Sequence, residues 1–413
     1  MQIRRDALAV ASLLAMAGCA GGNPLQSAPL QPAPVAREGI VHRANASGTV
    51  PLTISNLTGV KHAFFYIVGL GSDGNTYHVN AKGEAIPVKQ SDVKKDGYAD
   101  YSVPVPASGT ITLPLPELTA ARMYISFGKG LKVTVSSGNV PSSPPGWVSS
   151  DPNYNTPFDW IEFTYNDTGW NGNTTAVDMY GLPLQIQLTG SSGTQTVGTA
   201  SGGRSAIFSG LAQAAPFNAL VIKAPGKGGP FHDLRAIAPF HGIENGVFDP
   251  NYLDQYVSDV WNAFTTQTLT MNTSAWGVYA GTVSGTTLTF SQAGQQSITF
   301  SEPTTHDVYA NSGALAAQQC GSPPSQECLV QGQIADALSA ALNRTTLPQY
   351  PTLPACTASE FYVTPPVNEY ARLIHANAIN GLAYAFGFDD SCDFSSFVAD
   401  RAPTGVAVTI EPL

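Results

Sequence analysis

Charged side chains are scarce in this chain, since Asp, Glu, Lys and Arg together make up 12% of its 413 residues. The net charge is −10 and Lys and Arg form no basic stripe, which argues against nucleic acid as a partner because phosphate binding needs clustered cations. The sequence also lacks the G-x-S-x-G motif of serine hydrolases and the H-E-x-x-H motif of zinc proteases. Its seven histidines are scattered, and we expect His375 to be a packed, hydrogen-bonded helix residue rather than a catalyst.

The N-terminal apolar stretch, at residues 7–16, is too short to span a bilayer. It follows Arg4 and Arg5, a pattern that predicts an export signal over residues 1–18. The stretch ends in Met16-Ala17-Gly18-Cys19, which resembles a bacterial lipobox, so we expect cleavage before Cys19 and a lipid on Cys19. The alternative is an ordinary secretory signal in which Cys19 is incidental. We expect an exported protein, either a bacterial outer membrane lipoprotein or one at the cell surface or outside the cell, that meets the membrane only through this lipid.

Cysteine is rare as well, with five in the chain, and setting Cys19 aside leaves four. An even number fits disulfides in an oxidising compartment, and three pairings are possible. Closeness in sequence favours Cys320–Cys328 and Cys356–Cys392. A zinc site is the competing interpretation, which is disfavoured because the spacings do not resemble C-x-x-C pairs.

The composition changes along the chain divide it into regions. Residues 19–48, which begin with Cys19, are rich in Pro, Ala, Gly and Ser and predict a flexible tether. Residues 49–200 carry short strands with turn signals about every ten residues, which predicts a β lobe. Residues 201–398 predict a mixed α/β lobe, and residues 399–413 end in a strand that we expect to rejoin the β lobe. The fold class is therefore mainly β with an α+β second lobe, and we expect a monomer.

Three helices are predicted in the second lobe and none in the first. One begins at Asp249-Pro250, where Asp caps the helix and Pro occupies its first position. A second carries apolar residues at helical spacing over residues 334–342. The third begins near Asn368 and stops at Gly381.

Residues 69–74 match the G-x-G-x-x-G pattern of dinucleotide-binding proteins. That function requires a helix directly after the glycines, whereas residues 75–80 have the composition of a strand. We therefore interpret Asp73-Gly74 as a hairpin turn, and we expect no cofactor.

The most informative segment is residues 158–166, which read FDWIEFTYN. In a strand, Ile161, Phe163 and Tyr165 would face a core, and Trp160, Glu162, Thr164 and Asn166 would share the other face. An aromatic ring, a carboxylate, a hydroxyl and an amide in one row suit a sugar site, because the ring covers the apolar side of a pyranose and the polar groups bind its hydroxyls. A solvated outer face is the alternative, although it accounts poorly for Trp160.

A second carboxylate follows on the return of the chain. Trp170 lies in a Gly/Asn-rich loop and is a second candidate for an exposed aromatic ring. In the strand that we expect over residues 176–180, Asp178 and Tyr180 would share the outer face, and the register should switch near Gly181 and Pro183. Glu162 and Asp178 on adjacent strands suggest acid/base chemistry on a glycoside, in which one carboxyl protonates the leaving oxygen and the other activates water.

These motifs resemble those of glycoside hydrolase family 64, the bacterial β-1,3-glucanases that release laminaripentaose. Residues 162–166 match the family's E-x-T-x-N strand, and residues 178–184 match its D-x-x-G-[IL]-P strand. Residues 122–129, 260–264 and 340–347 are also similar to the family. Residues 384–390 read YAFGFDD where the family has YAFPYDD, so Gly387 and Phe388 replace Pro and Tyr.

The resemblance implies a thaumatin-like β-barrel or sandwich lobe and a mixed α/β lobe that enclose a wide groove. It implies that Glu162 is the general acid and Asp178 the general base of an inverting hydrolysis of β-1,3-glucan, releasing short laminari-oligosaccharides such as the pentaose. It further implies that Thr164, Asn166 and Trp170 hold sugar units. Asp389 either lines the groove or has a structural role.

Two other classes of protein remain as alternatives. The chain could be a non-catalytic β-glucan-binding lipoprotein with the same fold, which would have no need for both Glu162 and Asp178. It could also be a structural lipoprotein of the periplasm, which would not need an outward-facing Trp near acids.

Overall fold

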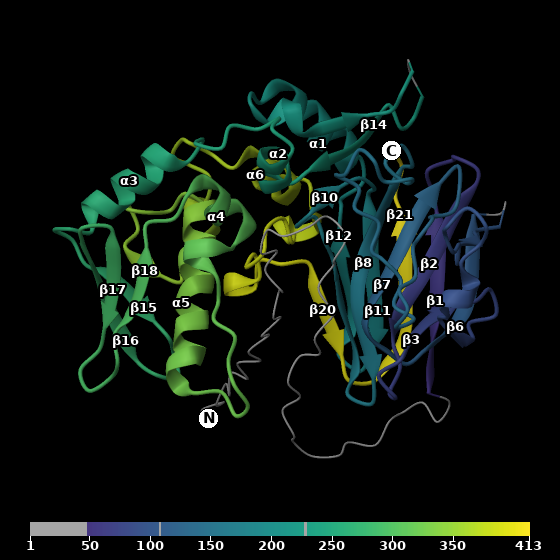
Figure 1. The fold of residues 1–413 in the computed structure, drawn as a ribbon, viewed down its shortest axis with the longest axis horizontal. Coiled ribbons are helices and arrows are strands. Elements are labelled where there is room, and N and C mark those ends of the chain that lie inside the picture. Colours follow the sequence, from purple (N-terminus) through teal and green to yellow (C-terminus); the bar gives the residue numbers. More distant parts are fainter. Residues whose placement is uncertain (1–47, 107–108, 227–228) are drawn as a thin grey trace.

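The computed structural model describes residues 48–106, 109–226 and 229–413. The signal peptide expected at residues 1–18, the lipidation expected at Cys19 and the tether up to residue 47 lie outside these residues. The structure is mostly β and contains several sheets. In Figure 1 the strands of the first lobe lie on the right and the helix-rich second lobe lies on the left. Within the described residues, no helix is both long and apolar enough to cross a membrane.

The first lobe is a sandwich of two sheets. The larger sheet has the order β20-β9-β8-β7-β2-β3-β4, with β5 paired to β2, and the smaller has the order β12-β11-β21-β1-β6. Apolar residues from both sheets, among them Ile54, Phe65, Phe163 and Val408, pack in one buried core between them. The strands of this lobe are β1 (Thr49–Asn56), β2 (Ala63–Leu70), β3 (Thr76–Val79), β4 (Ala85–Pro87), β5 (Val103–Pro104), β6 (Thr110–Pro116), β7 (Leu118–Phe127), β8 (Phe158–Asn166), β9 (Gly169–Thr174), β11 (Leu184–Gly190), β12 (Gly193–Gly198), β20 (Phe397–Asp400) and β21 (Pro403–Ile410).

Two features of this lobe bear on the sequence predictions. Strands β2 and β3 pair antiparallel, and Gly74 adopts a φ of +77° in the turn between them, so the G-x-G-x-x-G segment is a hairpin as predicted. Strand β21 runs parallel to β1 and antiparallel to β11, which places the last strand of the chain inside the first lobe.

The second lobe combines two small sheets with helices. Its sheets have the orders β10-β14-β13 and β18-β17-β16-β15-β19. Their strands are β10 (Met179–Tyr180), β13 (Val221–Lys223), β14 (Asp233–Ile237), β15 (Leu269–Asn272), β16 (Val278–Ser284), β17 (Thr287–Ser291), β18 (Ile298–Ser301) and β19 (Thr352–Leu353). The helices are α1 (Gly203–Gln213), α2 (Pro239–Glu244), α3 (Asp254–Ala263), α4 (Thr305–Ala310), α5 (Gln326–Asn343) and α6 (Glu369–Ala376).

The helix predictions gave the right lobe, but several of the bounds were wrong and three helices were missed. No α-helix lies among the described residues before 200, and α5 spans the predicted second helix. Helix α3 begins at Asp254 rather than at Asp249-Pro250, because the Asp249 carboxylate accepts a hydrogen bond from the Asn251 backbone and closes a turn instead. Helix α6 begins beside Asn368 as predicted, with Asn368 as its cap, but it ends at Ala376, before Gly381. Helices α1, α2 and α4 were not predicted, since they lack a strong apolar periodicity or are only six residues long.

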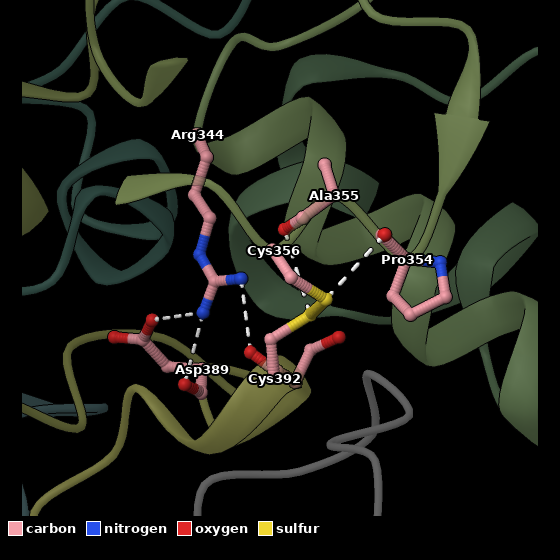
Figure 2. Close-up of a disulfide and its surroundings, with 7 residues drawn as sticks. Arg344, Pro354, Ala355, Cys356, Asp389 and Cys392 are labelled. Atoms are coloured by element: carbon pink, nitrogen blue, oxygen red, sulfur yellow. Dashed lines mark hydrogen bonds and ion pairs between the residues drawn. A yellow bond between two sulfur atoms is a disulfide. The ribbon is translucent and has the colours of Figure 1, made fainter. Parts of the chain in front are cut away.

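Both favoured disulfides are present. Cys320 pairs with Cys328 near the start of α5, and Cys356 pairs with Cys392 across a separation of 36 residues. Figure 2 shows the second disulfide beside Arg344 and Asp389, so it joins two loops at a buried ionic cluster of the second lobe.

Candidate active site

Glu162 lies in the middle of β8, between β7 and β9. From Ile161 onward β8 alternates as predicted, with Ile161, Phe163 and Tyr165 buried and Glu162, Thr164 and Asn166 partly exposed. The Glu162 side chain is 22% exposed. The pleat of one strand therefore presents a carboxylate to solvent above an apolar core.

Arg122 is the direct partner of Glu162. The two residues stand opposite each other in the β7–β8 pair, and Arg122 Nε donates to Glu162 Oε1 at 3.0 Å. The guanidinium also lies over the Trp160 ring, 5.6 Å from its centroid, and donates to Ser143 Oγ. Sequence reasoning gave Arg122 no role, because the partner of an outward carboxylate becomes visible only once the register of two strands is known.

The charge on Arg122 links the two candidate carboxylates. Burial alone would lower the pKa of Arg122, but the nearby Tyr124, Glu162 and Asp178 raise it above its ordinary value. Glu162 and Asp178 both act electrostatically on this one guanidinium.

Asp178 lies in a bend directly before β10 and not within a strand, so the alternation predicted for residues 176–180 is wrong. Strand β9 ends at Thr174, and the chain then leaves the large sheet to pair with β14 of the second lobe. The Ala238 backbone N–H donates to the Asp178 carbonyl at 2.9 Å, which brings the start of α2 beside this bend. The Asp178 side chain is 29% exposed.

Asp159 fastens the Asp178 segment to β8. Its carboxylate is buried and accepts hydrogen bonds from the backbone N–H groups of Gly181 at 2.7 Å and Leu182 at 3.0 Å. Burial raises the pKa of Asp159 to about 7, although these hydrogen bonds and Arg235 act in the opposite direction. The clamp places the segment after Asp178 directly against the beginning of β8. Gly181 and Pro183 lie where the chain passes from β10 to β11, the position predicted for a change of register.

His241 on α2 meets Asp178 from the second lobe. Its Nε2 lies 3.2 Å from Asp178 Oδ1, and its Nδ1 lies 2.7 Å from Glu244 Oε2. Glu244 Oε1 in turn lies 3.5 Å from His306 Nε2. The Trp147 ring stacks on His241 with centroids 3.9 Å apart and an interplanar angle of 15°. None of these four residues was singled out from the sequence, where they are scattered over 160 positions.

The pKa values of this cluster are shifted by its hydrogen bonds. Burial alone would lower the pKa of His241, but the hydrogen bonds to Asp178 and Glu244 raise it above its ordinary value. Burial likewise opposes ionisation of Glu244, but hydrogen bonds with His241 and His306 lower the pKa of Glu244 to about 2.

The aromatic residues predicted to be exposed are buried, and those predictions were wrong. Trp170 is 1% exposed and stacks on Phe163 inside the core of the first lobe. Trp160 is 2% exposed because the beginning of β8 is covered on both faces, on one of them by Tyr124 and Met179. Tyr180 is 4% exposed and belongs to the core of the second lobe, since β10 has already joined that lobe.

Thr164 and Asn166 remain on the partly exposed face that carries Glu162. Thr164 Oγ1 accepts a hydrogen bond from the Ala120 backbone, and Asn166 Oδ1 accepts two from Thr168 in the adjoining turn. Within the described part of the chain the Asn166 amide N–H groups have no partner, so they are free to bind a ligand.

Asp389 is fully buried and has structural partners. Its carboxylate bonds to Arg344 at 3.0 Å, to His375 at 2.8 Å and to the Ala385 backbone at 2.8 Å, as Figure 2 shows for Arg344. The alternative that Asp389 lines a groove is wrong, because its exposure is 0%. His375 also bonds to the Gly381 carbonyl, so it is the packed helix residue that the sequence predicted.

Comparison with known proteins supports the family that the motifs indicated. The sequence profile of the glycoside hydrolase family 64 proteins, described as Beta-1,3-glucanase, matches residues 48–410. A glucan endo-1,3-beta-glucosidase of Cellulosimicrobium cellulans is 31% identical over 373 residues, which cover 88% of this chain. The aligned region covers about 65% of the length of that relative.

Solved structures agree in fold. A laminaripentaose-producing beta-1,3-glucanase in complex with laminaritetraose superposes with a TM-score of 0.79 at 31% identity, covering 89% of this chain and 99% of that one. A beta-1,3-glucanase domain from Clostridium beijerinckii superposes with a TM-score of 0.73 at 26% identity, covering 88% of this chain and 98% of that one. With a family profile that spans nearly all of the described residues, the chain belongs to glycoside hydrolase family 64.

Proposed function

We propose that this protein hydrolyses β-1,3-glucan and that Glu162 and Asp178 carry out the reaction. The observation that carries the proposal is the pair of partly exposed carboxylates on adjoining segments, both acting on Arg122, in a chain of this family. Support for the substrate comes from the similar glucanase that was solved with laminaritetraose. We expect short laminari-oligosaccharides, such as the pentaose, as products.

The proposed reaction inverts the anomeric carbon in one step. Glu162 gives its proton to the glycosidic oxygen as the bond to the anomeric carbon breaks, and Asp178 takes a proton from the water that attacks the same carbon from the opposite side. Arg122 Nε donates to Glu162 Oε1, so this contact orients the carboxyl group that would reach the glycosidic oxygen. Inversion at a β-linkage yields the α-anomer first.

Sugar contacts are proposed for Thr164 and Asn166, which lie on the partly exposed face of β8 together with Glu162. A groove between the lobes would accept the polysaccharide, and we propose that the first lobe is thaumatin-like, as the family resemblance implies. The protein would need no partner other than the glucan.

Export is proposed from the sequence of residues 1–18 and from the two disulfides, which are stable in oxidising compartments. A lipid on Cys19 would attach the folded lobes to a membrane surface, with the outer membrane as the expected location.

A hydrolysis assay tests the function. The chain beginning at Ala20, without the signal and Cys19, is incubated with laminarin and the release of reducing sugar is measured. Glu162→Gln and Asp178→Asn should each lower kcat by at least ~100-fold, because each removes one acid/base group. Asp167→Asn is the matched control, since Asp167 is an exposed acid in the turn that follows β8 and should leave activity unchanged.

Two outcomes would contradict the proposal. Glucan binding without any release of reducing sugar would identify a non-catalytic glucan-binding protein instead. Proton NMR of fresh product that shows the β-anomer first would mean that one of the two carboxylates acts as a nucleophile and that the reaction retains configuration.

A further inference from the structure

The imidazole of His241 lies between two carboxylates. Nε2 lies 3.2 Å from Asp178 Oδ1 and Nδ1 lies 2.7 Å from Glu244 Oε2. An ionised carboxylate only accepts hydrogen bonds, and a neutral imidazole has a single N–H to donate. With both carboxylates ionised, the two hydrogen bonds can therefore form together only when His241 is an imidazolium with a proton on each nitrogen.

We propose that His241, kept as an imidazolium by Glu244, is a positioning residue that holds Asp178 Oδ1 and leaves Oδ2 to take the proton from water. The proposal rests on the proposed function, in which Asp178 is the general base. Among described residues 48–106, 109–226 and 229–413, Asp178 Oδ2 has no hydrogen-bonding partner on the protein. One carboxylate oxygen is thus fixed to α2 and the other is available to water.

The surroundings of His241 hold its ring in one orientation. The side chain is 4% exposed, with Trp147 stacked on it and Phe240 at 3.9 Å between ring centroids. A ring enclosed by aromatic neighbours cannot turn away from Asp178 without separating these contacts. The backbone carbonyl of Trp147 also accepts from Asn245 at the end of α2, which fixes Trp147 against the same helix.

The loop that carries Trp147 contacts the partners of both candidate carboxylates. Ser143 accepts a hydrogen bond from Arg122, the partner of Glu162, and Trp147 stacks on His241, the partner of Asp178. The neighbours of both acids are therefore contacted by Ser143 and Trp147, which lie four residues apart in one loop. This arrangement can keep the base at a constant place relative to the acid while a sugar chain binds.

The charges that face His241 determine the pH at which the arrangement is lost. Asp178 faces it from the bend before β10, Glu244 lies on α2 itself, and His306 on α4 bonds to the far oxygen of Glu244. Arg122 also acts electrostatically on Asp178. The two carboxylates favour the imidazolium, whose pKa is raised above its ordinary value. As the pH rises through that value, His241 loses a proton and one of its two hydrogen bonds. ¹⁵N-histidine NMR follows this step directly, whereas the alkaline limb of kcat/KM also depends on the general acid Glu162.

The first test changes Glu244, which does not touch Asp178. Glu244→Gln keeps the shape of the side chain and removes the charge that stabilises the imidazolium. The titration profile of the His241 imidazole, followed by ¹⁵N-histidine NMR, should move to lower pH by about 1 unit, as expected for the loss of one opposite neighbouring charge. Glu369→Gln is the matched control, since Glu369 is also a partly exposed helix acid with a basic partner three residues away, Arg372, and should leave the profile unchanged.

The second test changes His241 itself. His241→Gln retains an amide NH2 donor group but loses the charge and the donors on two separate ring nitrogens. It should lower kcat by about 100-fold with little change in KM, because a small misplacement of a reacting group has that cost. In ¹⁵N-histidine NMR of the unaltered enzyme, the imidazole signal that disappears in His241→Gln should show both nitrogens protonated at pH 7.

The results separate this inference from the proposed function. An inactive Asp178→Asn enzyme, together with a Glu244→Gln profile that superposes on that of the unaltered enzyme, would overturn the positioning role and leave the hydrolysis proposal standing. A neutral His241 at pH 7 would overturn it as well. An Asp178→Asn enzyme with full activity would instead overturn the proposed function, and the inference would fail with it.

Discussion

Asp389→Asn distinguishes a structural carboxylate from one that binds sugar. Asp389 is 0% exposed and Arg344 is 1% exposed, so neither charge is solvated by water. The substitution removes the negative charge that faces Arg344 and His375 while keeping the size of the side chain. Breaking a buried ion pair by removing one partner costs about 3–5 kcal/mol, because the remaining charge is left uncompensated.

The measurement is the free energy of unfolding in urea at pH 7, compared with Asp390→Asn as the matched control. Burial raises the pKa of Asp390 to about 6, and the charge of Asp389 contributes, so ionised Asp390 does not stabilise the fold. We expect Asp390→Asn to equal or exceed the unaltered protein in stability and Asp389→Asn to fall below it by about 3–5 kcal/mol.

The pH dependence of this difference has a definite sign. Burial raises the pKa of Asp389, but the charges of His375 and Arg344 outweigh it and lower that pKa below its ordinary value. Ionised Asp389 therefore stabilises the fold above the ordinary carboxyl pKa of ~3.9, and this stability is lost as the pH falls through the lower pKa of the folded protein. Asp389 raises the pKa of His375 against the effect of burial. The stability that the charged His375 contributes is therefore complete below the ordinary histidine pKa of ~6.5 and is lost as the pH rises through the higher pKa of the folded protein. The difference between Asp389→Asn and the unaltered protein should be greatest between these two limits. A stable Asp389→Asn enzyme with a raised KM for laminarin would refute the structural assignment.

Three further predictions concern stability. Asp336→Asn should raise the urea midpoint at pH 8 and change it less at pH 4, because burial raises the pKa of Asp336 to about 8 and its ionisation opposes folding as the pH rises. Replacing Cys356 and Cys392 by Ala should cost about 4 kcal/mol and replacing Cys320 and Cys328 about 2.5 kcal/mol, since loop-closure entropy grows with separations of 36 and 8 residues; equal losses would contradict this account. Trp170→Phe should lower the melting temperature without changing KM for laminarin, because the ring lies in the core; a raised KM would return Trp170 to the sugar site.

The residues of β8 show how far periodicity predicts a site. Alternation gave the correct face for Glu162, Thr164 and Asn166, because this half of the strand has a core on one side only. The same rule failed for Trp160, because the first half of the strand is covered on both faces once residues of β7 and the Met179 segment pack against it. A two-residue period assigns side chains to faces, but it does not tell which faces other elements cover.

The bend at Asp178 shows a second limit. Asp178 and Tyr180 were expected to share the outer face of a strand, yet Asp178 is partly exposed and Tyr180 is buried. The reason is that the chain changes sheets here, and β10 pairs with β14, more than fifty residues further along the chain. Strand pairing over such separations leaves no local signal in the sequence.

The residues that fix the two candidate catalytic acids are invisible to local patterns for the same reason. Asp159 accepts from backbone groups 22 and 23 residues away, and His241 meets Asp178 over a separation of 63 residues. Burial raises the pKa of Asp159 to about 7, yet its carboxyl group accepts three backbone N–H bonds, one of them from Trp160. Those hydrogen bonds offset part of the cost of burying Asp159 and hold the segment after Asp178 in one geometry. Acids that act on water and sugar must be partly exposed, and a short sequence motif is enough to identify them. The groups that position these acids are buried where distant segments of the chain meet, so no short motif contains them.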